Sequence, residues 1–288
     1  MSRRRALEGH RHGLAEIREI MGSMKTLAYM ETRKLARFLE AQSAVTRTIE
    51  DAAADLLSFF PQTLPEVRDA TPVYLLIGSE RGFCGDFNHA LLRHLQAQLP
   101  AGPDAAALLI AVGHKLATLL QDDARVVARV DGASAAEEAT HLLDRVVAEL
   151  ETLQTRHAAL TILCVHHSVE HGVRVQPLLP PFDGLGEGPP GHSQPPLLNE
   201  SPRRVLAELT EHYLFAALHQ ILYTSLMVEN QHRVAHLEGA LRHLDKQSAD
   251  LARRSNALRQ EEIIEEIEVV LLSAASLTEG PSGGPGRF

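Results

Sequence analysis

The 288-residue sequence has no tryptophan, only 4% aromatic residues and two cysteines. Cys84 and Cys164 form no CxxC pair, so we expect no disulfide framework and a reducing compartment. No run of about 18 apolar residues occurs, which argues against direct membrane insertion. The basic first residues lead into no apolar segment, so no secretory signal is expected. A net charge of −9 is not that of a chain that coats nucleic acid.

The overall composition, with 44% hydrophobic and 23% charged residues, is typical of a soluble globular protein. Ala, Leu, Glu and Arg are abundant, which favours helices. Charge is distributed unevenly, because residues 1–37 hold nine Lys or Arg against four Glu. This basic segment on an acidic protein indicates an acidic partner. It does not indicate nucleic acid, since its aromatic residues are not interleaved with its charges.

Residues 1–62 are predicted to form an N-terminal coiled-coil helix. Alternating steps of three and four residues from Leu14 reach Phe59, and only Glu31 and Gln42 interrupt the apolar series. A repeat of 3.5 residues sustained over this length is typical of a coiled coil. Pro61 and Pro65 end the helix.

Residues 70–200 are predicted to form a Rossmann-like α/β domain. Short apolar runs bounded by turn residues alternate with helical stretches, and this alternation favours a parallel, doubly wound sheet. The expected strands lie near 72–79, 106–113, 124–130 and 159–168, with a fifth at 173–180, and the helices near 86–99, 114–121 and 134–155. The Pro- and Gly-rich stretch 181–196 reads as an exposed loop.

Residues 201–277 are predicted to form a second long helix, which begins at Ser201 and Pro202. Its three-four apolar steps run from Val234 to Leu258 and then slip in phase to Ile263. The 278–288 tail is disordered by composition. Two long helices at opposite ends of the chain, each with an apolar stripe, pair most simply with each other. The predicted fold is therefore an α/β protein with a long antiparallel coiled coil of the N- and C-terminal helices.

The loop GSERGFCGDFN (78–88) lies between an expected strand and an expected helix. It lacks both GxxxxGK[ST] and GxGxxG, so it is no phosphate cradle by sequence and no cofactor is predicted. We interpret it as a scaffold turn, with Gly82 and Gly85 at unusual backbone dihedrals and Asp86 capping the next helix. Cys84 lacks the neighbours of a nucleophile and is expected to be a small, semi-buried thiol.

Two histidine-containing groups are candidate metal ligands. His166 and His167 in HHSVEH point to opposite faces of a strand, and Glu229, His232 and His236 have helical spacing without the HExxH order. Solvated helix faces explain these groups better, so no metal and no catalytic residue are predicted. The RQEEIIEEIE segment (259–268) is either a solvated face or the part of a protruding helix that enters a partner.

Four motifs resemble segments of the gamma subunit of F-type ATP synthases. SERGFCGDFN (79–88) is similar to that family's loop S-[DE]-R-G-[LF]-C-G-x-[LF]-N. ENQHRVAHLEGA (229–240) and RRSNALRQEEIIEEIEVVLLSAASL (253–277) resemble its C-terminal signatures, and IMGSMKTLA (20–28) resembles its ITKAMKMVA. These matches occur in order along the whole chain.

The resemblance implies a non-catalytic rotor shaft inside a hexamer of alpha and beta subunits. It implies contacts with the epsilon subunit and the membrane ring of c subunits, at the cytoplasmic face of the bacterial inner membrane. The implied subunit-contact and coupling residues are Met24, Lys25, Arg33, Glu229, Arg233, Arg259 and Gln260. Gly82, Cys84 and Gly85 would be scaffold.

Some positions depart from the family pattern. Glu16 and Glu19 lie in the usually more basic start, and Glu261, Glu262 and Glu265 replace small or hydroxylic residues. These departures suggest that the chain is a divergent gamma subunit and that it belongs to an alternative F-type ATPase of its host. A non-rotary coiled-coil adaptor is the second hypothesis, and a Rossmann-type enzyme is the third.

Overall fold

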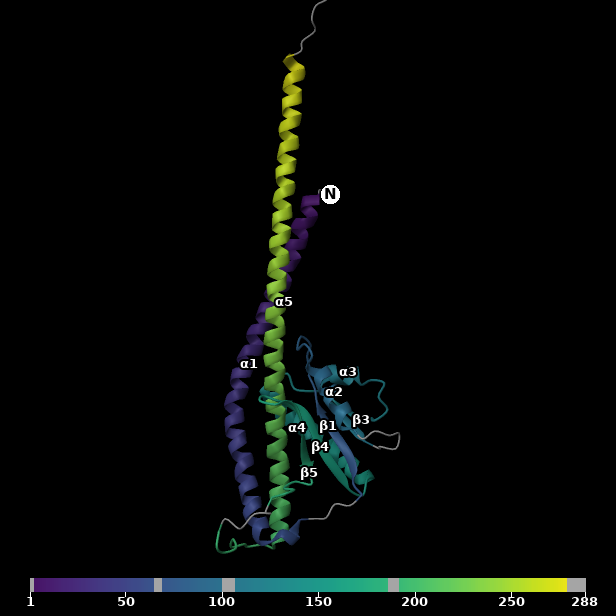
Figure 1. Cartoon of the computed structure of the whole chain (residues 1–288), viewed down its shortest axis with the longest axis vertical. Helices are drawn as coiled ribbons and strands as arrows, with labels where there is room; N and C mark the ends of the chain where they lie inside the picture. Colours follow the sequence, from purple (N-terminus) through teal and green to yellow (C-terminus); the bar gives the residue numbers. More distant parts are fainter. Residues whose placement is uncertain (1–2, 65–68, 100–106, 186–191, 279–288) are drawn as a thin grey trace, which may run out of the picture. The chain divides into compact units, whose positions relative to one another are not determined.

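The computed structural model describes residues 3–64, 69–99, 107–185 and 192–278 (Figure 1). Its helices are α1 (Arg3–Phe59), α2 (Phe87–Gln98), α3 (His114–Leu119), α4 (Ala139–Arg156) and α5 (Pro202–Thr278). Its strands are β1 (Thr71–Ile77), β2 (Leu108–Val112), β3 (Val126–Val130), β4 (Leu160–Ser168) and β5 (Gly172–Leu179). The expected elements are all present. Positions 186–191 of the predicted loop and 279–288 of the predicted tail lie outside the described residues.

Contacts divide the chain into two compact units, and α1 and α5 contribute to both. The first unit comprises Met1–Met24 and Leu237–Phe288. Within it, Arg4 Nη1 lies 3.6 Å from Glu262 Oε2, and Arg18 Nε lies 2.5 Å from Asp245 Oδ1. The paired residue on α5 has a lower residue number where the residue on α1 has a higher one, so the two helices run antiparallel.

The second unit is Lys25–His236 and holds the sheet. Here too α1 and α5 run antiparallel. The Phe38 and Tyr223 ring centroids are 5.8 Å apart, and the Gln42 amide donates to the Ala216 carbonyl at 3.0 Å. Within both units the predicted antiparallel pairing is confirmed.

The buried stripe of α1 departs from the predicted 3.5-residue repeat. That repeat placed Val45 and Ala52 in the seam, but both are exposed, and Thr46 and Ala53 are buried in their place. Leu35 and Ala53 are 18 residues apart, which is five turns at 3.6 residues per turn. The helix keeps its ordinary period here, so its apolar face drifts away from a strict heptad.

The sheet has the strand order β3-β2-β1-β4-β5. The pairs among β1, β2, β3 and β4 are parallel, as predicted, but β5 is antiparallel to β4. The fifth strand, whose direction the sequence analysis left open, therefore makes the sheet mixed at this edge. Only residues 169–171 join the two strands, which is far too short for the crossover that a parallel pair needs.

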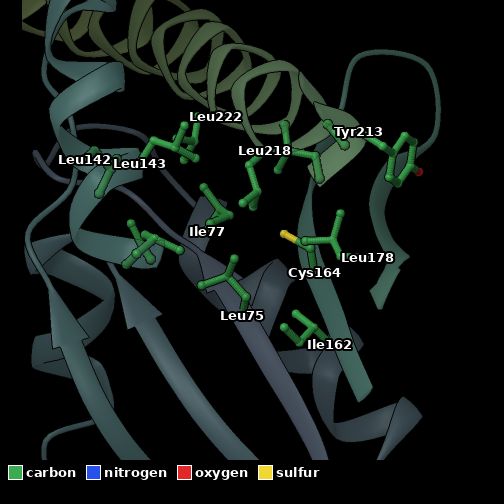
Figure 2. Close-up of a cluster of buried hydrophobic side chains, with 14 of the residues drawn as sticks. Leu75, Ile77, Leu142, Leu143, Ile162, Cys164, Leu178, Tyr213, Leu218 and Leu222 are labelled. Atoms are coloured by element: carbon green, nitrogen blue, oxygen red, sulfur yellow. The ribbon is translucent and has the colours of Figure 1, made fainter. Parts of the chain in front are cut away.

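Helices cover both faces of the sheet. On one face, β1, β2 and β4 pack against α4, α5 and α1. Figure 2 shows Leu75 and Ile77 of β1 and Cys164 of β4 pointing toward Leu218 and Leu222 of α5. On the other face, alternate residues of the same strands pack against α2 and α3. This layering is that of a doubly wound α/β domain, with the N-terminal half of α5 as one of its covering helices.

Candidate functional site

The loop 78–88 follows β1 at the carboxyl edge of the sheet. β1 has β2 on one side and β4 on the other, so the strand order reverses direction at β1. In open α/β sheets this switch point is where functional loops gather. The loop's position thus makes it the first candidate for a site.

Arg233 of α5 binds this loop from the side. Its Nε donates to the Gly82 carbonyl at 3.1 Å and its Nη2 to the Arg81 carbonyl at 3.4 Å. Its Nη1 donates to Asn230 Oδ1 at 2.8 Å, and its Nη2 pairs with the Glu229 carboxylate. We call these five residues the Arg233 cluster. The cluster ties one turn of α5 to the loop backbone by directional, charge-assisted bonds.

The two side chains that form the ion pair of the cluster are buried, with Glu229 3% and Arg233 6% exposed. Burial raises the pKa of the Glu229 carboxyl, while Arg233 and the backbone N–H groups of Glu80 and Arg81 oppose that rise. A buried carboxylate requires such partners, because an unpaired one is strongly destabilising. The pair and the loop therefore depend on each other.

Side chains of the loop add further bonds within it. Ser79 N–H donates to Asn88 Oδ1 at 2.9 Å, and Asn88 Nδ2 donates back to Ser79 Oγ at 2.8 Å. The Cys84 thiol donates to the Arg81 carbonyl at 3.4 Å, and burial raises the pKa of this thiol. Cys84 is thus more deeply buried than the semi-buried thiol that we expected, and its scaffold role stays a prediction.

Glu80 ties the loop to the neighbouring strands. Its Oε2 accepts from Gly132 N–H at 2.6 Å and from His114 N–H at 2.9 Å. Gly113 between β2 and α3 has a φ of 103°, and a Cβ there would lie 2.7 Å from the Ser79 carbonyl oxygen. Only glycine fits this close approach. The ends of β1, β2 and β3 are thereby held together.

Two local predictions for the loop need correction. Gly85 has a positive φ of 59°, but the second such residue is Phe83 at 64°, and Gly82 is not among them. Asp86 makes no side-chain cap to α2 and pairs instead with Arg93. Arg93 follows Asp86 by seven residues, or about two helical turns, so both lie on the same side of α2. The pairing with Arg93 draws the Asp86 carboxylate away from the helix start.

The histidine and glutamate groups are not the solvated helix faces that we expected. His166, His167 and Glu229 are buried, while His232 and His236 are exposed. His167 Nε2 bonds to the Phe87 carbonyl at 2.9 Å. Burial lowers the pKa of both His166 and His167 to about 4. Within the described residues, no three His, Cys, Asp or Glu side chains are placed to hold a metal ion.

A hollow of about 350 Å³ lies beside the loop. Phe83, Lys115 and His236 are among its lining residues. Phe83 is half exposed, and its ring centroid is 6.5 Å from that of His236. The loop does not end in the Lys-Ser/Thr pair that a Walker cradle uses, so the hollow does not have the sequence of a nucleotide site.

The other predicted contact residues lie on the long helices. On α1, Arg33 is exposed, and Met24 and Lys25 are partly buried; on α5, Arg259 and Gln260 are exposed. Subunit contact stays a prediction for these five and for Glu229 and Arg233, whose contacts shown here are internal.

Between Ile263 and Leu272 the apolar side chains of α5 are exposed. Ile263, Ile264 and Ile267 are 45–55% exposed, and Val269–Leu272 are 63–71% exposed. No described helix combines the length and apolar character that crossing a membrane demands. A stretch of exposed apolar side chains of this length marks an interaction surface.

Sequence reasoning missed Glu80, Asn88 and Asn230, which hold the loop, and Gly113. Glu80 and Asn88 lie inside the quoted loop motif, and Asn230 inside ENQHR, so the motifs contained the signal. Their partners are distant in sequence, which a pattern along the chain does not reveal.

Comparisons with known proteins agree with this architecture. The family model described as ATP synthase matches residues 4–277. Proteins named ATP synthase gamma chain, from Verminephrobacter eiseniae (strain EF01-2) and Variovorax paradoxus (strain S110), are each 23% identical over 96% of this chain and 99% of their own length.

Solved structures share the fold at lower identity. A chain of the Euglena gracilis mitochondrial ATP synthase (OSCP/F1/c-ring) matches with a TM-score of 0.63, 16% identity and 99% of each chain covered. A chain of the Tetrahymena thermophila central stalk and c-ring matches with a TM-score of 0.55 and 16% identity, over 77% of this chain and 99% of that one. Because the family model spans both long helices and the α/β domain between them, this chain belongs to the gamma-chain family of ATP synthases.

Proposed function

We infer that this chain is the central rotor shaft of an F-type ATPase, a non-catalytic subunit that couples ion flow to ATP synthesis or hydrolysis. The observation that carries this function is the family match over residues 4–277, together with α1 and α5 antiparallel within each unit. Its partners are the alpha and beta subunits, epsilon and the c-ring. The shaft acts by contacting different conformations of its neighbours unequally, which is what couples two equilibria.

We propose that residues 1–62 and 201–277 form the shaft and that residues 70–200 form the α/β foot. The exposed apolar stretch 263–272 is suited to a surrounding sleeve of protein, because such a surface is otherwise unfavourable in water. Met24, Lys25, Arg33, Arg259 and Gln260 contact the surrounding subunits. Support for the last three is their exposure and polarity.

The protein is a peripheral subunit, and we propose that it lies at the cytoplasmic face of the bacterial inner membrane. One observation supports this location. The curated relatives come from strains of Verminephrobacter eiseniae and Variovorax paradoxus.

Reconstitution tests the function directly. The purified chain is mixed with the alpha and beta subunits of its host, and the mass and composition of the product are measured by native mass spectrometry. We expect one copy of this chain for each alpha–beta hexamer. If the chain remains alone, the rotor function is refuted and the coiled-coil adaptor becomes the better hypothesis.

The coupling residues are tested in the assembled ATPase with the double variant R259A/Q260A. Hydrogen bonds to charged groups contribute about 1.5–3 kcal/mol each, so ATP-driven ion pumping should fall by about tenfold or more. R254A is the matched control, since Arg254 is also exposed but on another face of α5. Unchanged pumping in R259A/Q260A, or an equal loss in R254A, would remove these two residues from the proposal.

A further inference from the structure

An open groove lies between α4 and α5 in the second unit. Its volume is about 540 Å³. Ile162 of β4 and Leu178 of β5 lie at its floor, and both are buried (Figure 2). We define the α4–α5 groove by six of its apolar lining residues, Val147, Leu150, Ile162, Leu178, Leu214 and Phe215.

The walls of the groove are two helix faces with apolar stripes. α4 contributes Val147 and Leu150, three residues apart, and α5 contributes Leu214 and Phe215. Phe215 is 52% exposed, although its neighbours on the sheet side are buried. Large apolar side chains that face an open hollow lose the dispersion contacts that a partner would supply.

The rim of the groove is acidic. Glu151 projects from the α4 wall and Glu211 from the α5 wall, and both are exposed. No Lys, Arg or His belongs to the lining, and neither carboxylate forms an ion pair with another described residue. The groove therefore combines an apolar floor with negative charge on both edges.

We propose that the α4–α5 groove binds an amphipathic helix of another polypeptide, with Lys or Arg on both sides of its apolar face. Walls made by two helices suit a third helix, whose leucines enter at three- and four-residue spacing. Glu151 and Glu211 complement the flanking cations and reject acidic helices. The apolar end of α5 carries five glutamates in residues 261–268. The same acidic rim therefore excludes the α5 end of a second copy of this chain as the helix that occupies the groove.

The proposal is tested on the full chain, independently of any ATPase assembly. The probe is a synthetic helix of about 18 residues, or five turns, with leucines in one stripe and lysines on both flanks. Its partner probe carries glutamates in place of the lysines. Fluorescence anisotropy measures binding of each labelled peptide, and we expect the lysine peptide to bind at least about tenfold more tightly.

Variants locate the binding surface. F215A should weaken binding of the lysine peptide by about tenfold, because a central aromatic anchor is lost. E151K/E211K should weaken it by a similar factor and favour the glutamate peptide. D144K is the matched control, since Asp144 is an exposed acid of α4 outside the groove. The mutated side chains are all exposed, and equal urea midpoints would confirm that the variants fold.

Three results would overturn the proposal. The first is no preference for the lysine peptide, and the second is an equal loss of binding in D144K. The third is self-association of the wild-type chain in sedimentation velocity that F215A abolishes, which would make a second copy the occupant.

Discussion

Replacing Arg233 by methionine removes the cation of the Arg233 cluster while keeping an unbranched side chain of helical propensity. The Glu229 carboxylate then remains buried without its partner, and the carbonyls of Arg81 and Gly82 lose their donor. Opening of the loop 78–88 away from α5 would expose the carboxylate to water. R233M should therefore favour an open loop over the closed one.

The size of this effect follows from the burial of the pair. Removing one partner of a buried ion pair costs about 3–5 kcal/mol. An open loop hydrates Glu229 and avoids this cost, so the closed state alone is penalised. Since each 1.36 kcal/mol corresponds to a factor of ten, the open population should rise by about 150- to 5,000-fold.

The two cysteines supply the assay. Cys84 lies in the loop and its thiol donates to the Arg81 carbonyl, whereas Cys164 lies in β4 under α5 and is fully buried. Reaction with a thiol reagent under native conditions, read by mass spectrometry of peptides, reports loop opening at Cys84 and global unfolding at Cys164. We expect R233M to accelerate Cys84 labelling by the factor above and to leave Cys164 much slower.

Two further variants separate this explanation from general destabilisation. R93M removes the exposed Asp86–Arg93 ion pair of the same region. Because ion pairs that are screened by solvent contribute little to stability, the rate of Cys84 labelling in R93M should stay within about threefold of wild type. E229Q/R233M removes the stranded charge and should recover part of the protection. If Cys84 in R233M reacts no faster than in R93M, Arg233 does not hold the loop.

Two other predictions concern stability. The pKa of His166 and of His167 is lowered to about 4, so below about pH 6.5 the unfolded chain binds protons that the folded chain does not. The free energy of unfolding should fall as the pH falls from 6.5 to 4, by about 2 kcal/mol for each histidine at pH 5. Urea unfolding at pH 7 and at pH 5 measures this loss. The variant H167Q should make the free energy of unfolding less dependent on pH. G113A should cost roughly 3 kcal/mol or more, because its Cβ meets the Ser79 carbonyl oxygen at 2.7 Å. Gly172 also has a positive φ, of 68°, but has open space around it, so G172A should cost only about 1 kcal/mol. Equal urea midpoints for the two variants would contradict this reasoning.

The elements of the fold could be predicted because each signal is local. Apolar runs bounded by turn residues located every strand, and the three-four steps located both long helices. The antiparallel direction of β5 was also present in the sequence, in the three residues that separate it from β4. The register of α1 could not be read from its apolar series, since Val45 and Thr46 are both acceptable in a seam until the partner helix is in place.

The site itself depends on contacts that are distant in sequence. Gly82 and Arg233 are 151 residues apart, and nothing in either motif indicates that they meet. Glu229 seemed solvated because it shares helical spacing with His232 and His236, which are indeed exposed. The useful signal was the four-residue spacing of Glu229 and Arg233, which places two opposite charges on one helix face.

The kind of contact matters for a shaft. Apolar packing of α5 on the sheet opposes separation but is non-directional, so it resists rotation about the helix axis only through the fit of side chains. The bonds from Arg233 to two successive loop carbonyls have fixed directions, and they fix the azimuth of α5 relative to β1. Torque applied to the α/β domain then reaches α5 through a small number of directional bonds as well as through the core. A chain whose loop opens in R233M would keep its fold and lose angular stiffness, so the Cys84 measurement also tests how rotation is transmitted.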